Sequence, residues 1–124
     1  MSRKHKRRNN KLGTEAFHDK ILYDLQDRLY EDGLEPFAKD EYGHLRFGKR
    51  HSRGEIDIGC FVKNTLHIYE VKSNYKLNNR LKAYSQLKRA KKFYQSVYGD
   101  KITIERHYVS PMKYRAGYII EDVR

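Results

Sequence analysis

Two short apolar-rich segments near the middle of the chain constrain its fold more than any other feature. They span residues 55–62 and 66–71, and Lys63, Asn64 and Thr65 lie between them. Apolar segments of this length, joined by a short polar turn, are typical of a β-hairpin. The sequence therefore predicts two antiparallel strands at its centre.

Segments with helical periodicity flank this hairpin. From about Glu15 to about Glu31 apolar residues recur at every fourth position, with Thr14 as N-cap and Gly33 as the stop. A second helix is expected over residues 77–98, closed by Gly99. The first apolar stripe contains Phe17, His18, Ile21, Leu22, Leu25 and Leu29. The second contains Ala83, Leu87, Ala90, Tyr94 and Val97.

Shorter strands complete the expected order of elements. A short strand is predicted over residues 44–47, another over 101–109 with Ile102, Ile104 and Arg106 on one face, and a last one over 114–120. Helices alternating with strands in this way indicate an α/β fold, in which helices flank a central mixed sheet.

Length and composition allow one domain. A chain of 124 residues has room for one core. With 38% apolar residues, 35% charged residues and a mean hydropathy of −0.99, that core is small. A homodimer is expected, because a second copy would let the chain bury more apolar surface. The sequence contains neither a membrane span nor a secretory signal, which predicts an intracellular protein. Its single cysteine, Cys60, excludes an intramolecular disulfide, and no zinc-site spacing occurs.

The distribution of charge predicts a polyanionic partner. The net charge is +11, and residues 1–12 are expected to form a disordered basic arm ahead of a domain spanning 13–124. No acidic residue lies between Val71 and Gly99, where basic residues accumulate, so the second helix presents another basic face. A solvated helix face and a localisation tail are the alternative interpretation; nucleic acid, with DNA favoured over RNA, is the expected partner.

Alternation along the hairpin predicts where its acidic groups lie. On the first strand Asp57 should share a face with Glu55, while Ile56 and Ile58 take the other face. On the second strand Glu70 and Lys72 should share a face, and Tyr69 and Val71 the opposite one. Antiparallel pairing can then bring the two acidic faces side by side.

Two adjacent carboxylates repel each other unless a cation lies between them. Mg²⁺, or Mn²⁺ in its place, accepts two carboxylates and a backbone carbonyl together with water, so Asp57, Glu70 and the carbonyl of Val71 are candidate ligands. Lys72 would then position an attacking water or neutralise developing charge on a phosphate. The alternative is that Glu70 and Lys72 form only a charged face of an edge strand, with Asp57 paired to Arg53.

Two short sequences carry a family resemblance: Gly-Glu-Ile-Asp-Ile at 54–58 and Tyr-Glu-Val-Lys-Ser at 69–73. They resemble the motif of the PD-(D/E)XK nuclease superfamily, in particular archaeal-type Holliday junction resolvases and RecB-like nucleases. The resemblance covers about residues 14–98 and implies a restriction-endonuclease-like core of helix, β-meander, helix and strand. It implies a metal-dependent endonuclease that acts on DNA, including junction or branched DNA, and leaves a 5′-phosphate.

The resemblance also assigns residues outside the hairpin. Glu15 on the first helix would be a further catalytic acid, and Gln86 on the second helix an accessory residue, followed by an aromatic residue at Phe93 or Tyr94. Glu55 is a possible additional ligand. Basic residues near the motif are expected to contact nucleic acid: Arg46, Lys49, Arg50, Arg53, Lys76 and Arg80. Two other functions remain open, a non-catalytic nucleic-acid-binding protein and an assembly protein of a nucleoprotein particle.

Overall fold

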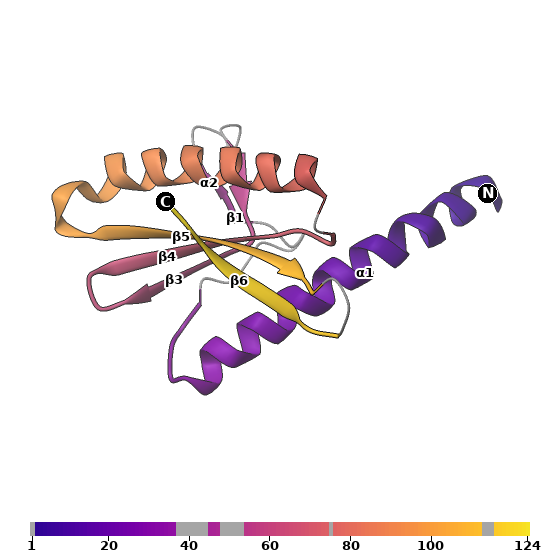
Figure 1. The fold of residues 1–124 in the computed structure, drawn as a ribbon, viewed down its shortest axis with the longest axis horizontal. Helices are drawn as coiled ribbons and strands as arrows, with labels where there is room; N and C mark the ends of the chain where they lie inside the picture. Colours follow the sequence, from indigo (N-terminus) through magenta and orange to yellow (C-terminus); the bar gives the residue numbers. More distant parts are fainter. Residues whose placement is uncertain (1, 37–44, 48–53, 75, 113–115) are drawn as a thin grey trace.

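The computed structural model describes residues 2–36, 45–47, 54–74, 76–112 and 116–124. The side chains of residues 2–16, 45–47 and 54–55 lie outside this description. Within it, no helix is long and apolar enough to cross a membrane. The described parts form an α/β structure with two long helices and a central mixed sheet, as the sequence predicts (Figure 1).

The central sheet has four strands in the order β3-β4-β5-β6. β4 and β5 run parallel, and the two outer pairs are antiparallel. The parallel pair is joined through helix α2, because parallel neighbours need a long crossover connection. The strands span Ile58–Val62 (β3), Thr65–Val71 (β4), Thr103–Pro111 (β5) and Tyr118–Val123 (β6).

The predicted hairpin is confirmed in β3 and β4. Val62 pairs with Thr65, so the turn consists of Lys63 and Asn64 alone, and Thr65 begins the second strand. Lys63 adopts a positive φ of 54°, as tight hairpin turns require. The hairpin places the end of β4, with Glu70 and Val71, beside the start of β3.

The first strand of the hairpin is shorter than predicted. The expected strand over 55–62 is divided at Asp57 into β2 (Gly54–Ile56) and β3, and β2 pairs with β1 (Leu45–Phe47) in a separate two-stranded sheet. The short strand expected over 44–47 is thus present from Leu45 onward, and residue 44 lies outside the described part.

This division corrects the predicted faces of the first strand. Ile56 and Ile58 do not share a face: Ile56 packs with helix α2, whereas Ile58 packs with helix α1 on the other side of the sheet. The bend at Asp57 removes the alternation on which the prediction relied. On β4 the prediction is confirmed, because Tyr69 and Val71 pack together on the α1 side.

Helix α2 (Leu77–Tyr98) has the predicted bounds. Its backbone ends at Gly99, which has a φ of 65° and donates its N–H to the Gln95 carbonyl. A single 3₁₀ turn, η2 (Gly99–Lys101), leads into β5. Val97 is 57% exposed and not part of the core, because it lies in the last helical turn, next to η2.

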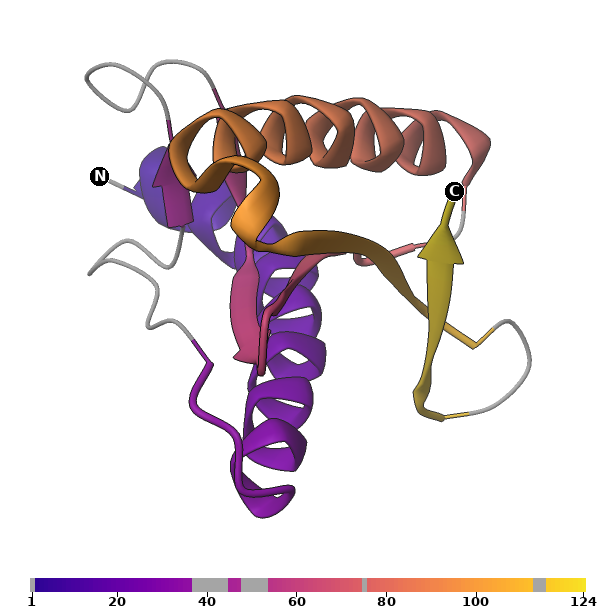
Figure 2. The same ribbon diagram turned by 90° about the vertical axis from the view of Figure 1, so that its left-hand side faces the viewer.

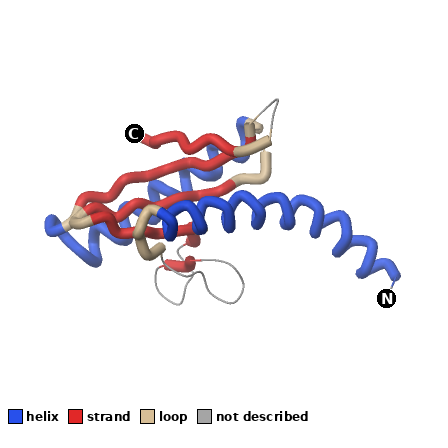
Figure 3. Tube along the Cα trace, turned by 90° about the horizontal axis from the view of Figure 1, so that it is seen from below, coloured by secondary structure: helices blue, strands red, loops and turns tan. Residues whose placement is uncertain are grey.

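Helix α1 (Ser2–Glu31) is longer than predicted. The expected start at Glu15 is wrong, because the helix also includes the basic segment from Ser2 that was expected to be a disordered arm; this segment contains good helix formers and no proline. Its N-terminal part extends past the sheet (Figures 1 and 3). Phe17 is 43% exposed, so the buried stripe begins one turn later, at Ile21.

The two helices cover opposite faces of the sheet (Figure 2). Each helix packs its apolar stripe on alternate residues of the same strands, which is why β4 is apolar on both faces. On the α1 side the buried core contains Ile21, Leu22, Leu25, Leu29, Ile58, Cys60, Tyr69, Val71 and Val109. On the α2 side it contains Ile56, Leu66, Ile68, Ala83, Leu87, Ala90, Ile104 and Tyr108.

The last two strands begin later than predicted. β5 starts at Thr103 because η2 occupies the preceding residues, and Ile102 and Ile104 both pack on the α2 side, as expected. β6 starts at Tyr118, not at 114; residues 113–115 lie outside the described part.

A chain of hydrogen bonds connects three strands on the α1 side. The Nδ1 atom of His67 on β4 lies 2.8 Å from the Nε2 atom of His107 on β5. The Nδ1 atom of His107 lies 2.8 Å from the Asp122 carboxylate on β6. The two histidines and the Asp122 carboxylate thus form one connected polar chain across β4, β5 and β6.

This pair predicts a pH-dependent stability. Burial, and then the neighbouring His107, lowers the pKa of His67 below its ordinary value of 6.5. The unfolded chain then binds the proton more readily than the folded one, so this residue's stabilising contribution is fully present above pH 6.5 and is lost as the pH falls below 6.5 through the lower pKa of the folded state. We expect urea unfolding to show a smaller loss of stability between neutral and mildly acidic pH in His67→Gln than in the native chain. An equal loss in both proteins would contradict this assignment.

Candidate functional site

Asp57 lies at the bend between β2 and β3, beside the end of β4. Its carboxylate Oδ2 atom accepts the backbone N–H of Val71 at 2.8 Å and lies 3.3 Å from the Nε2 atom of His18 on α1. Its own N–H donates to the Tyr69 carbonyl at 3.1 Å. Asp57 is only 5% exposed, and these contacts join α1 to β4 in the interior.

Glu70, near the end of β4, is the second buried acid. It is 4% exposed, and its Oε2 atom lies 3.1 Å from the ammonium group of Lys72. Its Oε1 atom is buried and has no hydrogen-bond partner within the described part of the structure. Burial, and then the negative charge of Asp57, raises the pKa of Glu70 well above its ordinary value, although Lys72 acts in the opposite direction.

Lys72 follows β4 directly and connects the acids to helix α2. Besides its contact with Glu70, its ammonium group donates a hydrogen bond to the Gln86 side-chain oxygen at 2.9 Å. Its backbone N–H donates to the Val109 carbonyl at 2.9 Å, which holds this residue against β5. Lys72 and Gln86 are therefore adjacent, as the family resemblance implies for these positions.

The carbonyl of Val71 points to the same side as Asp57. In a strand, the N–H and C=O of one residue point toward the same neighbouring strand. Tyr69 accepts a hydrogen bond from Asp57 through its carbonyl, and Val71, two residues later, donates its N–H to the Asp57 carboxylate. Alternation thus directs the Val71 carbonyl past the end of β3, on the side of the Asp57 carboxylate.

His18 on α1 also belongs to this cluster, although its place on the apolar stripe predicts only a packing role. Its two ring nitrogens lie 3.3 Å from carboxylate oxygens of Asp19 and Asp57. Burial lowers the pKa of His18, but the two carboxylates outweigh burial and raise this pKa above 6.5. Its position on the apolar stripe of α1 was the available signal, because a titratable residue in such a stripe must find a buried partner.

Several predicted site residues lie elsewhere or outside the described part. Glu15 belongs to α1, three residues before His18, Glu55 belongs to β2 and Arg46 to β1, but their side chains are not described. Lys49, Arg50 and Arg53 lie wholly outside the described residues.

Two basic residues predicted to contact nucleic acid are described. Lys76 is exposed at the N-cap of α2. Arg80 is bound within the protein, because it donates hydrogen bonds to the Tyr84 hydroxyl and the Glu121 carboxylate. Arg80 therefore fixes β6 to α2, which reduces its availability to a ligand.

The donor set fits a hard divalent cation. Within the described residues, no group of three histidine, cysteine or acidic side chains could hold a metal ion. Asp57 and Glu70 nevertheless supply two adjacent carboxylates, and the unpartnered Oε1 atom of Glu70 is a buried acceptor without a donor. Mg²⁺ is commonly held by one or two carboxylates together with several waters, so two acids and a carbonyl are sufficient ligands.

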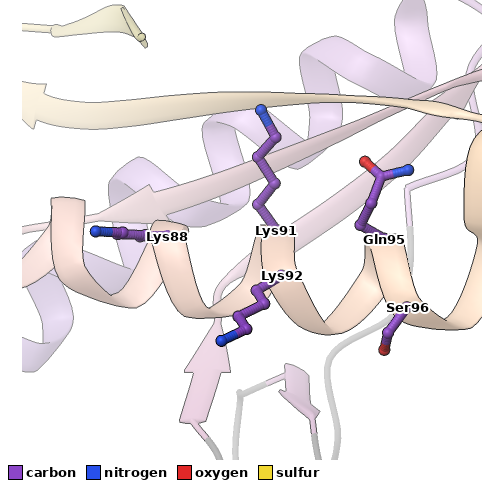
Figure 4. Close-up of a pocket in the computed structure, with 5 residues that line it drawn as sticks. All are labelled: Lys88, Lys91, Lys92, Gln95 and Ser96. Carbon is purple, nitrogen blue, oxygen red and sulfur yellow. The ribbon is translucent and has the colours of Figure 1, made fainter.

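A second feature lies on helix α2. A shallow hollow of about 420 Å³ on its surface is lined by three lysines and two neutral polar residues, without any acid (Figure 4). Its lining residues are Lys88, Lys91, Lys92, Gln95 and Ser96. Lys91 and Gln95 point to one side of the helix, and Lys92 and Ser96 to the other (Figure 4).

No family model and no curated protein matches this chain.

The buried Glu70 predicts an unusual effect on stability. The stabilising contribution of a carboxyl with a raised pKa is fully present below its ordinary pKa of 4.5 and is lost as the pH rises through the raised pKa of the folded state. Glu70→Gln should therefore stabilise the metal-free protein at neutral pH, by about 1–3 kcal/mol, since it removes a buried charge and supplies an amide donor. Urea unfolding in a chelator would measure this change. If Glu70→Gln instead destabilises the protein at neutral pH, relative to an exposed control such as Glu105→Gln, the assignment of Glu70 as a buried acid with an unpartnered oxygen is contradicted.

Proposed function

We propose that this protein is a metal-dependent endonuclease that hydrolyses phosphodiester bonds in DNA. The observation that carries the proposal is the pair of buried carboxylates, Asp57 and Glu70, with the Lys72 ammonium group beside them. Such a pair is unfavourable in a purely structural role, because burial and mutual repulsion both oppose ionisation. A site that holds a cation accounts for both features.

Asp57, Glu70 and the Val71 carbonyl would hold Mg²⁺ or Mn²⁺, with Glu15 as a further acid. When bound, the cation would lower the pKa of a water and neutralise charge on a phosphate. His18 and the Val71 N–H both contact the Oδ2 atom of Asp57, so they fix its orientation and leave Oδ1 as the oxygen available to a ligand.

Lys72 would act on the reacting phosphate. Its ammonium group is held by Glu70 on one side and Gln86 on the other, so it needs little reorganisation to face a ligand beside Glu70. In this position it would orient the attacking water or neutralise the charge that develops on the phosphate oxygens. Gln86 would keep the amine in place.

The order of elements supports membership of the PD-(D/E)XK superfamily. Helix α1, the hairpin of β3 and β4, helix α2 and the parallel strand β5 follow the order of the restriction-endonuclease-like core. Under this proposal the substrate is DNA rather than RNA, and branched DNA such as a four-way junction is the preferred form. A homodimer would bury apolar side chains that are exposed in the single chain, such as Phe17, Tyr23 and Tyr30 on α1.

A second candidate function is a non-catalytic nucleic-acid-binding protein. The observation that favours it is the exposed basic surface of α2, which carries no acidic residue over its whole length. This function requires neither a metal ion nor the buried acids. Removal of the Asp57 charge would then leave nucleic-acid binding unchanged, or strengthen it.

The endonuclease proposal predicts cleavage that depends on both metal and site. Linear, nicked, single-stranded and four-way-junction DNA, together with RNA of the same sequence, would be incubated with the purified protein in Mg²⁺ or in chelator. We expect cleavage of DNA in Mg²⁺ alone, with Asp57→Ala and Lys72→Ala each reducing the rate by at least about 100-fold, since each removes a group acting on the reacting phosphate.

Matched controls exist in the exposed turn η2, where Asp100→Ala and Lys101→Ala remove the same charges far from the cluster along the chain. Both controls should retain the native rate. Cleavage that survives Asp57→Ala and Lys72→Ala would rule out this active site. Metal-independent DNA binding without any cleavage would favour the second candidate function.

A further inference from the structure

We infer that one side of helix α2, formed by Lys82, Gln86 and Arg89, binds the phosphate backbone of the nucleic acid next to the reacting phosphate. We call these three residues the site flank of α2. The inference rests on the proposed function, since it says where the nucleic-acid strand would run beyond the phosphate at the candidate active site. It adds Lys82 and Arg89 as binding residues.

The contact between Gln86 and Lys72 identifies which side of α2 faces the site. Lys82 lies four residues before Gln86 and Arg89 three residues after it, so both project within about 60° of Gln86 around the helix axis. Both are exposed. Helix α2 also packs against β2, the strand that ends one residue before Asp57, which places this flank beside the cluster.

The opposite side of α2 faces away from the site. Arg80 and Tyr84 bind Glu121 there, which shows that this side is turned toward β6. Lys88 and Lys91 project about 140–160° away from Gln86 around the helix axis. In Figure 4, Lys91 extends outward from the helix, on the side opposite to Lys92 and Ser96.

Charge makes the site flank suitable for phosphates. Lys82 and Arg89 have no ion-pair partner within the described part of the structure, in contrast to Arg80, and α2 contains no acid. The two residues lie about 10 Å apart along the helix axis, which corresponds to about three phosphates of one strand at 3.4 Å each. Two such contacts release counterions and make binding dependent on salt.

Two double variants test the inference, because they remove the same charge from the same helix. Lys82→Gln/Arg89→Gln changes the site flank, and Lys88→Gln/Lys91→Gln changes the opposite side. Binding to a short fluorescent DNA duplex would be measured in chelator, which prevents cleavage, over a range of salt concentrations. Unchanged thermal unfolding of both variants would show that the fold is retained.

We expect the site-flank variant to lower the slope of log affinity against log salt by about 1.8, because each lost phosphate contact contributes about 0.9. The opposite-side variant should change the slope by much less. Equal changes in both variants, a larger change in the opposite-side variant, or no binding of DNA by the native protein would each overturn the inference.

The outcome is separable from that of the proposed function. If the native protein binds DNA through the site flank but never cleaves it in Mg²⁺, the endonuclease proposal fails and the binding surface stands. If it cleaves DNA but the two variants behave alike, the endonuclease proposal stands and the site flank is excluded.

Discussion

The hydrogen bond from the Val71 N–H to the Asp57 carboxylate is the interaction on which the arrangement of the cluster depends. Asp57 lies where β3 would otherwise continue to pair with β4. The Val71 N–H is therefore accepted by the Asp57 side chain and not by the backbone of a neighbouring strand. The bend that results sends Ile56 to the α2 core and Ile58 to the α1 core. The Asp57 carboxylate thus ends the pairing of β3 with β4 and also lies at the centre of the candidate site.

The proximity of Asp57 makes ionisation of Glu70, the second buried acid, unfavourable. Glu70 is buried beside Asp57, and its Oε1 atom has no hydrogen-bond partner among the described residues. Proteins generally satisfy buried polar atoms, and exceptions concentrate at functional sites, where a ligand completes the set. The unpartnered oxygen of Glu70 is therefore the feature of the cluster that most favours a bound ligand.

Local patterns predicted the hairpin, the bounds of α2 and the proximity of Glu70 to Lys72, because strand alternation and helical period are properties of neighbouring residues. The prediction failed where a distant group decides the outcome. Alternation placed Ile56 and Ile58 together, but the bend depends on Val71, a partner far along the chain. The contact between His18 and Asp57 joins residues 39 positions apart, and no local period contains it.

The sequence by itself determined that acids and a lysine lie at the end of a hairpin, and that a helix without acidic residues follows, since both depend on residue order alone. Only the tertiary structure decided how these groups face one another. Packing of α1 and α2 on opposite faces brings His18 to Asp57 from one side and Gln86 to Lys72 from the other. Burial between those layers is what raises the pKa of Glu70, and burial is a property of the assembled fold.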